Sequence, residues 1–240
     1  MMTVEVESAP ANGYTREYYE ARPNLMLWTE VRQLMSLVAV KPGERVLELG
    51  CGGGAFLSAC AERRPSLVVG LDVNGEAAAV ARRQAPAAQL ALADALRLPF
   101  DDGAFHAIVA QHLIEHFERP DPVLQEWARI LAPGGRIVVA TPNVDYPDRA
   151  LFDDATHHHI YSMAGLKEVF QSNGFHVERC RTLMPFLGNR RLTWKLAYSF
   201  PRLLLVLGLL PYFRERGLTL FLLARKSREV GLVKSGNATT

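Results

Sequence analysis

The sequence predicts an α/β fold in which helices cover both faces of a mostly parallel β-sheet. Strand-like and helix-like segments alternate through the middle of the 240-residue chain, which predicts parallel strands joined by helical crossovers. The first four strand-like segments are short and apolar on both faces, as strands are when helices pack on both sides of a sheet. A glycine-rich turn, Gly50–Gly54, follows the first of them, and such turns approach nucleotide-like ligands closely.

Seven segments have strand patterns and predict a doubly wound, Rossmann-like sheet. They span residues 45–49, 67–72, 89–94, 107–111, 136–141, 175–182 and 218–224. Between them, helices are predicted over about residues 54–63, 75–84, 121–131 and 162–173. We expect Asp121 to cap the third of these helices, with Pro122 in its first turn. Ser162 is expected to cap the fourth helix, which stops at Asn173-Gly174.

The length suits a single domain with appended elements. We expect a helical N-terminal segment over residues 1–40, a core over 41–182, a helical insertion over 183–216, a last strand over 217–226 and a flexible tail over 227–240. Apolar stretches flanked by arginines make the insertion distinctive. It fits four roles: a helical cover over the sheet, a wall of an apolar ligand pocket, a homodimer interface, or a surface in peripheral contact with a membrane.

Composition narrows the classes of function. A net charge of +2 is too balanced for a concentrated basic stripe, so no nucleic-acid partner is expected. The three cysteines fit no metal-site spacing and are typical of reduced thiols in a cytosolic protein. The first residues lack a secretory pattern, and the most apolar window, residues 203–210, is too short to span a bilayer. We therefore expect a cytoplasmic protein, with contact to the inner membrane face left open.

Three acidic residues stand at the ends of the first three predicted strands. Glu48 precedes the glycine turn, where it would repel a pyrophosphate but suit a cationic amino group. Asp72 lies about 20 residues beyond the turn, where a carboxylate can accept hydrogen bonds from ribose hydroxyls. Asp94 ends the third strand, where it can accept from an adenine amino group while the Ala95 N–H serves a ring nitrogen. Acids without a basic partner favour a ligand that carries positive charge.

With these motifs the chain resembles the class I S-adenosylmethionine-dependent methyltransferases, and looks closest to their ubiquinone- and menaquinone-type small-molecule branch. The matching segments cover about residues 45–175. They are Leu47–Gly54, Gly70–Val73, Asp94-Ala95 with Leu98–Asp101, Gln111–His116 and Leu131–Ile137.

The resemblance implies that the last strand runs antiparallel to the others and that S-adenosyl-L-methionine is the cofactor. Asp72 would hold the ribose and Asp94 the adenine. The remaining residues assigned to the cofactor site are Tyr19, Glu48, Gly50, Cys51, Gly52, Val73, Ala95 and Gln111, of which Gly50 and Gly52 would line the methionine part. The leading helix would form a lid, with Tyr14, Tyr18 and Tyr19 as candidates for closing contacts.

Methyl transfer to a hydroxyl needs alignment of donor and acceptor and a base, for which histidine has a suitable pKa. The candidates are His112, His116 and the run of residues 157–159. We expect His157 to be the base or the group that orients the acceptor, because it occupies a position where many relatives carry a histidine. A structural role for the run, with its histidines bonded to backbone, is the alternative. No metal site is expected, since consecutive histidines cannot all face one ion on regular backbone.

The function predicted from these patterns is transfer of a methyl group to an oxygen of a small or lipid-like acceptor. Two rival functions remain open. A nicotinamide-dependent oxidoreductase also has a glycine-rich turn, although Glu48 and Asp94 argue against it. A catalytically inert relative that binds cofactor and serves as a partner subunit would carry the same motifs.

Overall fold

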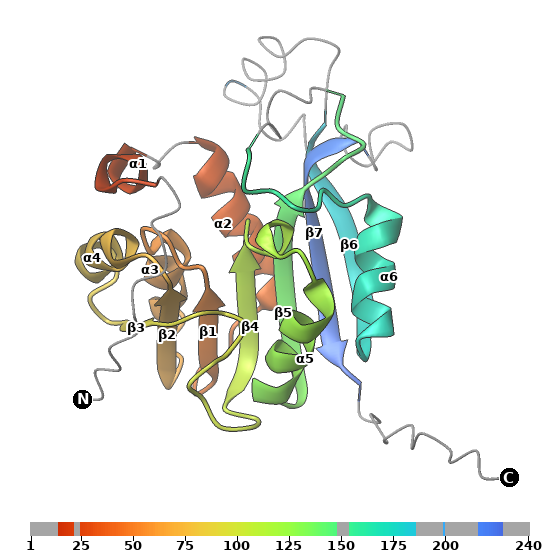
Figure 1. Cartoon of the computed structure of the whole chain (residues 1–240). Helices are drawn as coiled ribbons and strands as arrows, with labels where there is room; N and C mark the ends of the chain where they lie inside the picture. Colours follow the sequence, from red (N-terminus) through yellow and green to blue (C-terminus); the bar gives the residue numbers. More distant parts are fainter. Residues whose placement is uncertain (1–13, 22–24, 148–153, 186–198, 200–215, 228–240) are drawn as a thin grey trace, which may run out of the picture.

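The computed structural model describes residues 14–21, 25–147, 154–185, 199 and 216–227, and the structure of these residues is the one analysed below. A seven-stranded sheet with the order β3-β2-β1-β4-β5-β7-β6 forms the centre (Figure 1). The strands are β1 (Arg45–Leu49), β2 (Leu67–Asp72), β3 (Gln89–Leu92), β4 (Phe105–Gln111), β5 (Leu131–Pro142), β6 (Phe175–Pro185) and β7 (Gly217–Lys226). Only β7 runs against its neighbours, since it pairs antiparallel with both β5 and β6. The predicted Rossmann-like sheet with an antiparallel last strand is thus confirmed.

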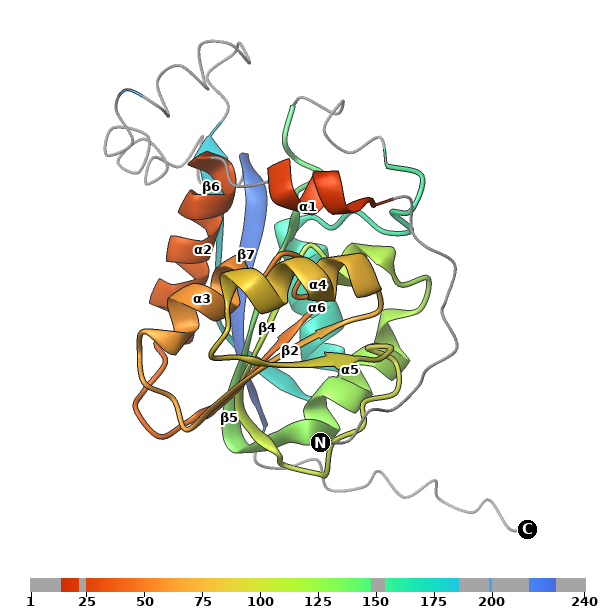
Figure 2. The ribbon, with the colours of Figure 1, turned by 90° about the vertical axis from the view of Figure 1, so that its left-hand side faces the viewer.

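Helices cover both faces of this sheet. They are α1 (Arg16–Ala21), α2 (Leu25–Val38), α3 (Ala55–Ala61), α4 (Gly75–Gln84), η1 (Ile114–His116), α5 (Pro120–Ile130) and α6 (Met163–Ser172). Figure 2 shows α2 and α3 on one side of the strands and α5 and α6 on the other. The side chains of β1 alternate accordingly: Val46 packs in the core that includes α2 and α3, and Leu47 and Leu49 pack in the core that includes α5 and α6.

The structure confirms one of the two predicted helix caps and contradicts the other. Ser162 caps α6 as predicted, because its hydroxyl accepts the Gly165 N–H at 3.1 Å. The prediction that Asp121 caps α5 is wrong. Pro120 occupies the first helical position and Arg119 the cap, since a proline fits a first turn that needs no N–H donor. The carboxylate of Asp121 instead accepts a hydrogen bond from Asn173 Nδ2 at 2.7 Å, at the end of α6.

The strand ends also differ in places from the sequence expectation. β3 stops at Leu92, so Asp94 lies two residues beyond the strand rather than at its end. β5 begins at Leu131, directly after α5, and reaches Pro142. The helical pattern before the first strand divides into α1 and α2, and α1 lies beside α4 at the carboxyl edge of the parallel strands (Figure 1).

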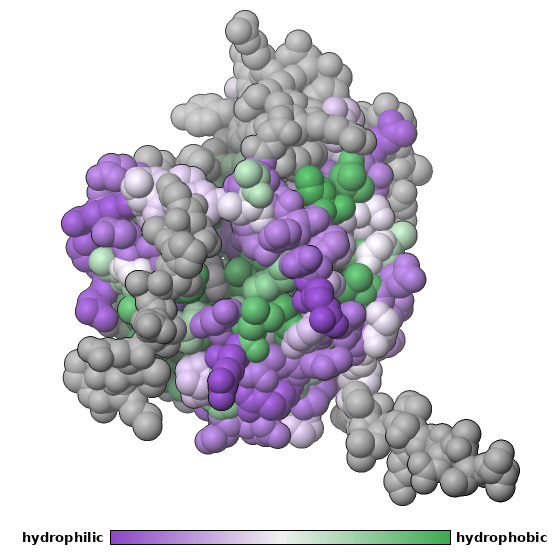
Figure 3. All heavy atoms as spheres, viewed as in Figure 1, coloured by the Kyte–Doolittle hydropathy of each residue, from purple (hydrophilic) through white to green (hydrophobic). Residues whose placement is uncertain are grey.

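The surface shown in Figure 3 is largely hydrophilic, with separate apolar patches. Large apolar side chains that stay exposed among the described residues are Tyr18, Trp28, Val73, Leu92 and Leu96. No helix in the described ranges is long and apolar enough to cross a membrane. Most of the predicted insertion, residues 183–216, lies outside the described residues, so its four suggested roles stay predictions.

A buried ion pair anchors the end of α2 to the sheet. The guanidinium of Arg136 on β5 donates to both carboxylate oxygens of Glu44, at 2.8 and 2.6 Å, and also to the carbonyl oxygens of Val38 and Ala39. Arg136 is only 7% exposed. These hydrogen bonds satisfy carbonyls that the end of α2 leaves without helical partners. The pair therefore fixes where α2 ends and where the chain turns into β1.

We predict that Arg136→Met destabilises the fold by about 1–3 kcal/mol, because it removes the charged partner of Glu44 and the donor to two helix-end carbonyls, while the Lys41 N–H still donates to Glu44. Urea unfolding followed by circular dichroism would measure this. Arg16→Met is the matched control, since the Arg16–Glu20 pair is about half exposed and should contribute less than about 1 kcal/mol. Equal effects of the two substitutions would contradict the prediction.

The contribution of this pair should also depend on pH. The hydrogen bonds from Arg136 lower the pKa of Glu44 below its ordinary value. The stabilisation is therefore present above the unfolded-state pKa of about 4.3 and is lost as the pH falls through the lowered folded-state value. The difference in unfolding free energy between the wild type and Arg136→Met should shrink in acid.

Candidate functional site

A cavity of about 590 Å³ opens at the carboxyl ends of the parallel strands. This is the edge at which such sheets bind their ligands. One side, formed after β1, β2 and β3 and by α1, contains Tyr19, Gly50, Gly52, Asp72, Val73, Asp94 and Ala95. The other side, formed after β4 and β5 and by β7, contains His112, His116, Pro142, Asp154, His157, Leu218 and Thr219. Gln111 and Leu113 also line the cavity.

The glycine turn after β1 brings backbone to the wall of this cavity. Gly50 has a φ of 65°, and a Cβ there would lie 3.2 Å from Leu113 Cδ1. Gly54, with a φ of 82°, stands at the start of α3, where a Cβ would lie 3.0 Å from Ala81. Side chains at either position would be both strained and crowded. The turn therefore needs glycine for its own geometry, and it leaves room for a ligand at Gly50 and Gly52.

Asp72 holds the turn and faces the cavity. Its carboxylate accepts hydrogen bonds from the backbone N–H groups of Gly52, at 2.8 Å, and Asn74, at 2.9 Å. Burial raises the pKa of this carboxyl, although those two donors work in the opposite direction. A ligand with hydroxyl donors would stabilise the charged form further. Asp72 thus lines the cavity, and its assignment to a ribose stays a prediction.

Glu48 and Cys51 lie behind the turn rather than in the main cavity. They line a smaller adjoining cavity of about 100 Å³, together with Gly50 and Gln111. Glu48 is 3% exposed, and its Oε2 has no hydrogen-bond partner among the described residues. Burial, and after it the charge of Asp72, raise the pKa of Glu48 well above the ordinary value. A cationic or hydrogen-donating group of a ligand at the turn would supply the missing partner of this oxygen.

Val73, Asp94 and Ala95 form the end of the cavity beyond β2 and β3. Val73 is 39% exposed and Ala95 is buried, so an apolar side chain and a small one face the space together. Asp94 is exposed, and its Oδ1 accepts the Leu96 N–H at 2.9 Å. Asp94 therefore stabilises its own turn while its other oxygen stays available. A flat ring system with an exocyclic amino group fits these surroundings.

The three tyrosines of the N-terminal segment cover the cavity. Tyr14 and Tyr18 stack with ring centroids 4.6 Å apart, and Tyr19 meets Tyr18 edge to face. Tyr19 is buried and touches both cavities. Tyr14 bridges the two sides of the main cavity, since its hydroxyl donates to Asp154 at 2.6 Å and its carbonyl accepts from Asn74 at 3.1 Å. The three tyrosines therefore line the cavity, and a role of this segment as a lid stays a prediction.

Sequence reasoning missed a buried acid on α2 that organises the floor of the cavity. Glu30, 2% exposed, accepts hydrogen bonds from Gln111 Nε2 at 2.7 Å and Thr219 Oγ1 at 2.6 Å. His112 Nε2 lies 3.1 and 3.2 Å from its two oxygens. The sequence carried no clear signal for it, because Arg32 and Gln33 make the stretch from Leu25 to Val38 amphipathic and an acid there is not unusual.

His112 is held between two buried carboxylates. Its Nδ1 lies 3.3 Å from Glu115 Oε1, opposite the contact with Glu30. Burial opposes charge on the ring, but the carboxylates prevail and raise the pKa of His112 to about 10. The pairing, together with bonds from Thr219 and Gln111, lowers the pKa of Glu30 despite its burial. At neutral pH this histidine is an imidazolium and a counter-ion rather than a base.

The run of three histidines does not act as one group. His157 lines the cavity with 11% of its side chain exposed, and burial lowers its pKa. His158 and His159 are exposed, and His159 Nε2 lies 2.8 Å from the Glu118 carbonyl. The segment is a turn rather than an extended strand, which is why His159 does not share the face of His157. His157 is thus the neutral histidine that faces the cavity from this run.

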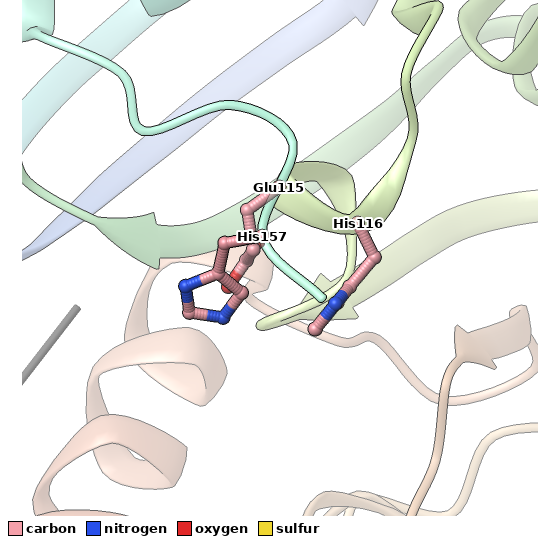
Figure 4. A group of neighbouring side chains, drawn as sticks. All are labelled: Glu115, His116 and His157. Atoms are coloured by element: carbon pink, nitrogen blue, oxygen red, sulfur yellow. The ribbon is translucent and has the colours of Figure 1, made fainter. Parts of the chain in front are cut away.

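One group of side chains is close enough for its donor atoms to share an ion. Atoms of Glu115, His116 and His157 lie within 4.8 Å of one another (Figure 4). His116 Nδ1 already contacts Thr156, and Glu115 Oε2 accepts from Thr141. These contacts give the group a role in packing the cavity wall. The expectation that the chain binds no metal stays a prediction.

Comparison with known proteins agrees with this geometry. Residues 47–139 match a protein-family model described as a methyltransferase domain. A demethylmenaquinone methyltransferase of Thermus thermophilus is 41% identical over 113 residues, which cover 45% of this chain and 51% of the relative. A fatty-acid O-methyltransferase of Mycolicibacterium smegmatis is 40% identical over 118 residues, covering 46% and 43%. The chain thus spans about half the length, or less, of these curated relatives.

A solved structure shares the fold at low sequence identity. The Haemonchus contortus phosphoethanolamine N-methyltransferase 2, in complex with S-adenosyl-L-methionine, has a TM-score of 0.66 and 17% identity, covering 89% of this chain and 58% of its own. Residues 47–139 are therefore similar to a methyltransferase domain, and the fold of the chain is shared with an enzyme of that kind.

We predict that Asp72→Ala weakens binding of S-adenosylhomocysteine by at least about tenfold, since hydrogen bonds to a charged group contribute about 1.5–3 kcal/mol. Isothermal titration calorimetry would measure the change. Asp102→Ala is the matched control, because Asp102 is 81% exposed at the opposite edge of the sheet. Unchanged affinity in Asp72→Ala, with the fold intact, would contradict the assignment.

Proposed function

We propose that the whole chain is an S-adenosylmethionine-dependent methyltransferase that transfers the methyl group to an oxygen of a small or hydrophobic acceptor. The observation that carries this proposal is the division of one cavity into two sides. The glycine turn, Asp72 and Asp94 line the side suited to the cofactor, and His157 lines the other side. Transfer in line from sulfur to oxygen requires donor and acceptor to lie in one enclosed space.

On the cofactor side, we assign the ribose to Asp72, the adenine to Val73, Asp94 and Ala95, and the methionine part to Gly50, Gly52 and Gln111. Glu48 and Cys51, behind the turn, would support this part from the smaller cavity. Tyr19 would close over the cofactor. When bound, the cofactor supplies an electrophilic methyl on a cationic sulfur, and the buried acids of this side suit that charge.

On the acceptor side, we assign the role of base or acceptor-orienting group to His157. Burial keeps its imidazole neutral at physiological pH, as a base must be. His112 is a poorer candidate, because its two carboxylate neighbours keep it protonated. Met26, Leu113, Phe117, Pro142 and Leu218 line the same cavity and favour an acceptor with apolar surface. The relatives that methylate a fatty acid and a demethylmenaquinone are consistent with such an acceptor.

Binding measurements separate this proposal from a nicotinamide-dependent oxidoreductase. The purified full chain should bind S-adenosylhomocysteine in a calorimetric titration and should not bind NADH or NADPH. Incubation with methyl-labelled S-adenosylmethionine and a panel of phenols, quinols, fatty acids and amines should then label an oxygen-bearing acceptor. Tight nicotinamide binding without S-adenosylhomocysteine binding would refute the proposal. Binding without turnover on any acceptor would favour the inert partner subunit.

We predict that His157→Gln lowers kcat about 100-fold or more, the range expected when a general base is lost. The affinity for S-adenosylhomocysteine should stay within about twofold, because His157 is assigned to the acceptor and not to the cofactor. The matched control is His158→Gln, whose exposed imidazole should not affect the rate. Equal rates in His157→Gln and the wild type would exclude the assigned role.

A further inference from the structure

Two buried polar atoms next to the cavity have no hydrogen-bond partner among the described residues and belong to neighbouring side chains. They are Glu115 Oε1 and His157 Nδ1. Glu115 is fully buried, and one of its oxygens and one ring nitrogen of His157 lie within 4.8 Å. Figure 4 shows the two side chains converging, with Glu115 on η1 and His157 on the segment before α6. Buried groups of this kind are rare and need a functional or structural explanation.

Backbone hydrogen bonds hold these two residues next to each other. The carbonyl oxygen of Glu115 accepts the N–H groups of His158, at 2.8 Å, and His159, at 3.1 Å. The N–H of His157 is held in turn by the Asp154 carbonyl at 3.0 Å. The histidine segment is thus attached to the same residue whose carboxylate lies beside the His157 ring. The Glu115 carboxylate therefore lies beside both the His157 ring and His112, whose Nδ1 is 3.3 Å from its Oε1.

From this arrangement, and resting on the function proposed above, we propose that Glu115 is the positioning residue of His157. Its carboxylate accepts the Nδ1–H of the imidazole, and this leaves Nε2 facing the cavity to take the proton of the acceptor. A histidine base is commonly oriented in this way, by a buried carboxylate that accepts a hydrogen bond from its second ring nitrogen.

The other carboxylates nearby are less suited to this role. Asp154 Oδ2 lies 4.0 Å from Nε2, on the nitrogen that must stay open, and already accepts from Tyr14. Its Oδ1 accepts from the N–H and hydroxyl of Thr156. Glu30 is occupied by His112, Gln111 and Thr219. Glu115 has one oxygen bonded to Thr141, and its other oxygen has only the 3.3 Å contact with His112.

The proposed step balances in atoms and charge. The acceptor hydroxyl gives its proton to His157 Nε2 as its oxygen forms the new O–C bond. The S–C bond breaks and its electron pair stays on sulfur, which yields neutral S-adenosylhomocysteine. The positive charge thereby passes from sulfur to the imidazole, where the Glu115 carboxylate stabilises it.

A double-mutant cycle tests whether Glu115 acts through His157. We expect Glu115→Gln to lower kcat at least about tenfold with the KM for S-adenosylmethionine unchanged, using the panel acceptor with the highest turnover. In the His157→Gln background the same change should cause no further loss, because the partner is gone. Glu118→Gln, an exposed neighbour, is the control. Losses that multiply in the double variant would overturn the proposal.

Nitrogen-15 NMR of the histidine rings in the wild type tests the proposal independently of turnover. Neutral His157 in the wild type should carry its proton on Nδ1, and Glu115→Gln should lower its pKa. A wild-type Nε2–H tautomer would overturn the proposal even if methyl transfer is proven. Conversely, a chain without methyl transfer but with the Nδ1–H tautomer would refute the function and leave the pair intact. Activity that is lost with a chelator and restored by zinc would also overturn it.

Discussion

The arrangement of the cavity depends on one buried charge, the imidazolium of His112 between Glu30 and Glu115. Both carboxylates are buried away from water, and an uncompensated buried charge costs several kcal/mol. The His112 ring, which lies between them, supplies the compensating positive charge. Glu30 comes from α2 and Glu115 from η1, while Thr219 and Thr141 bring β7 and β5 to the same carboxylates. The backbone of His112 has a φ of 51° at this position, a strained value for a residue with a side chain. Four elements from distant parts of the chain thereby meet around His112.

A second constraint operates on the cofactor side, where acids accumulate without a basic partner. Glu48 and Asp72 are both buried, and they lie so close to each other that the charge of Asp72 raises the pKa of Glu48. Asp72 is stabilised by two backbone donors, whereas Glu48 has an oxygen with no partner among the described residues. A cationic ligand lowers the energy of both acids, and an anionic pyrophosphate raises it. These two buried acids therefore suit a cationic ligand better than an anionic pyrophosphate.

The sheet could be predicted from the sequence because its signals are local, and the same signals bring the residues assigned to the cofactor to one edge of the sheet. Gly50, Asp72 and Asp94 follow strands whose apolar patterns are clear, and parallel strands bring their carboxyl ends to one edge. The cap at Asp121 was wrong because Pro120 competes for the first turn. Glu30 and Thr219 could not be predicted as neighbours, since the contact joins positions 189 residues apart. The resemblance singled out His157 among the three histidines, and in the turn at residues 154–159 it lines the cavity while His158 and His159 are exposed.

The proposed reaction connects the two sides of the cavity, because it moves a positive charge from one side to the other. Before transfer, positive charge lies on the cofactor sulfur, near the acids beyond β1 and β2. After transfer it lies on an imidazole beside Glu115, which the sheet places across the same cavity. His112 then has two functions in the fold. It neutralises Glu30, and its Nδ1 lies 3.3 Å from the Glu115 carboxylate, which also lies beside the His157 ring. Because both imidazoles lie beside this one carboxylate, Glu115 links the buried charge of His112 to the proposed reaction centre.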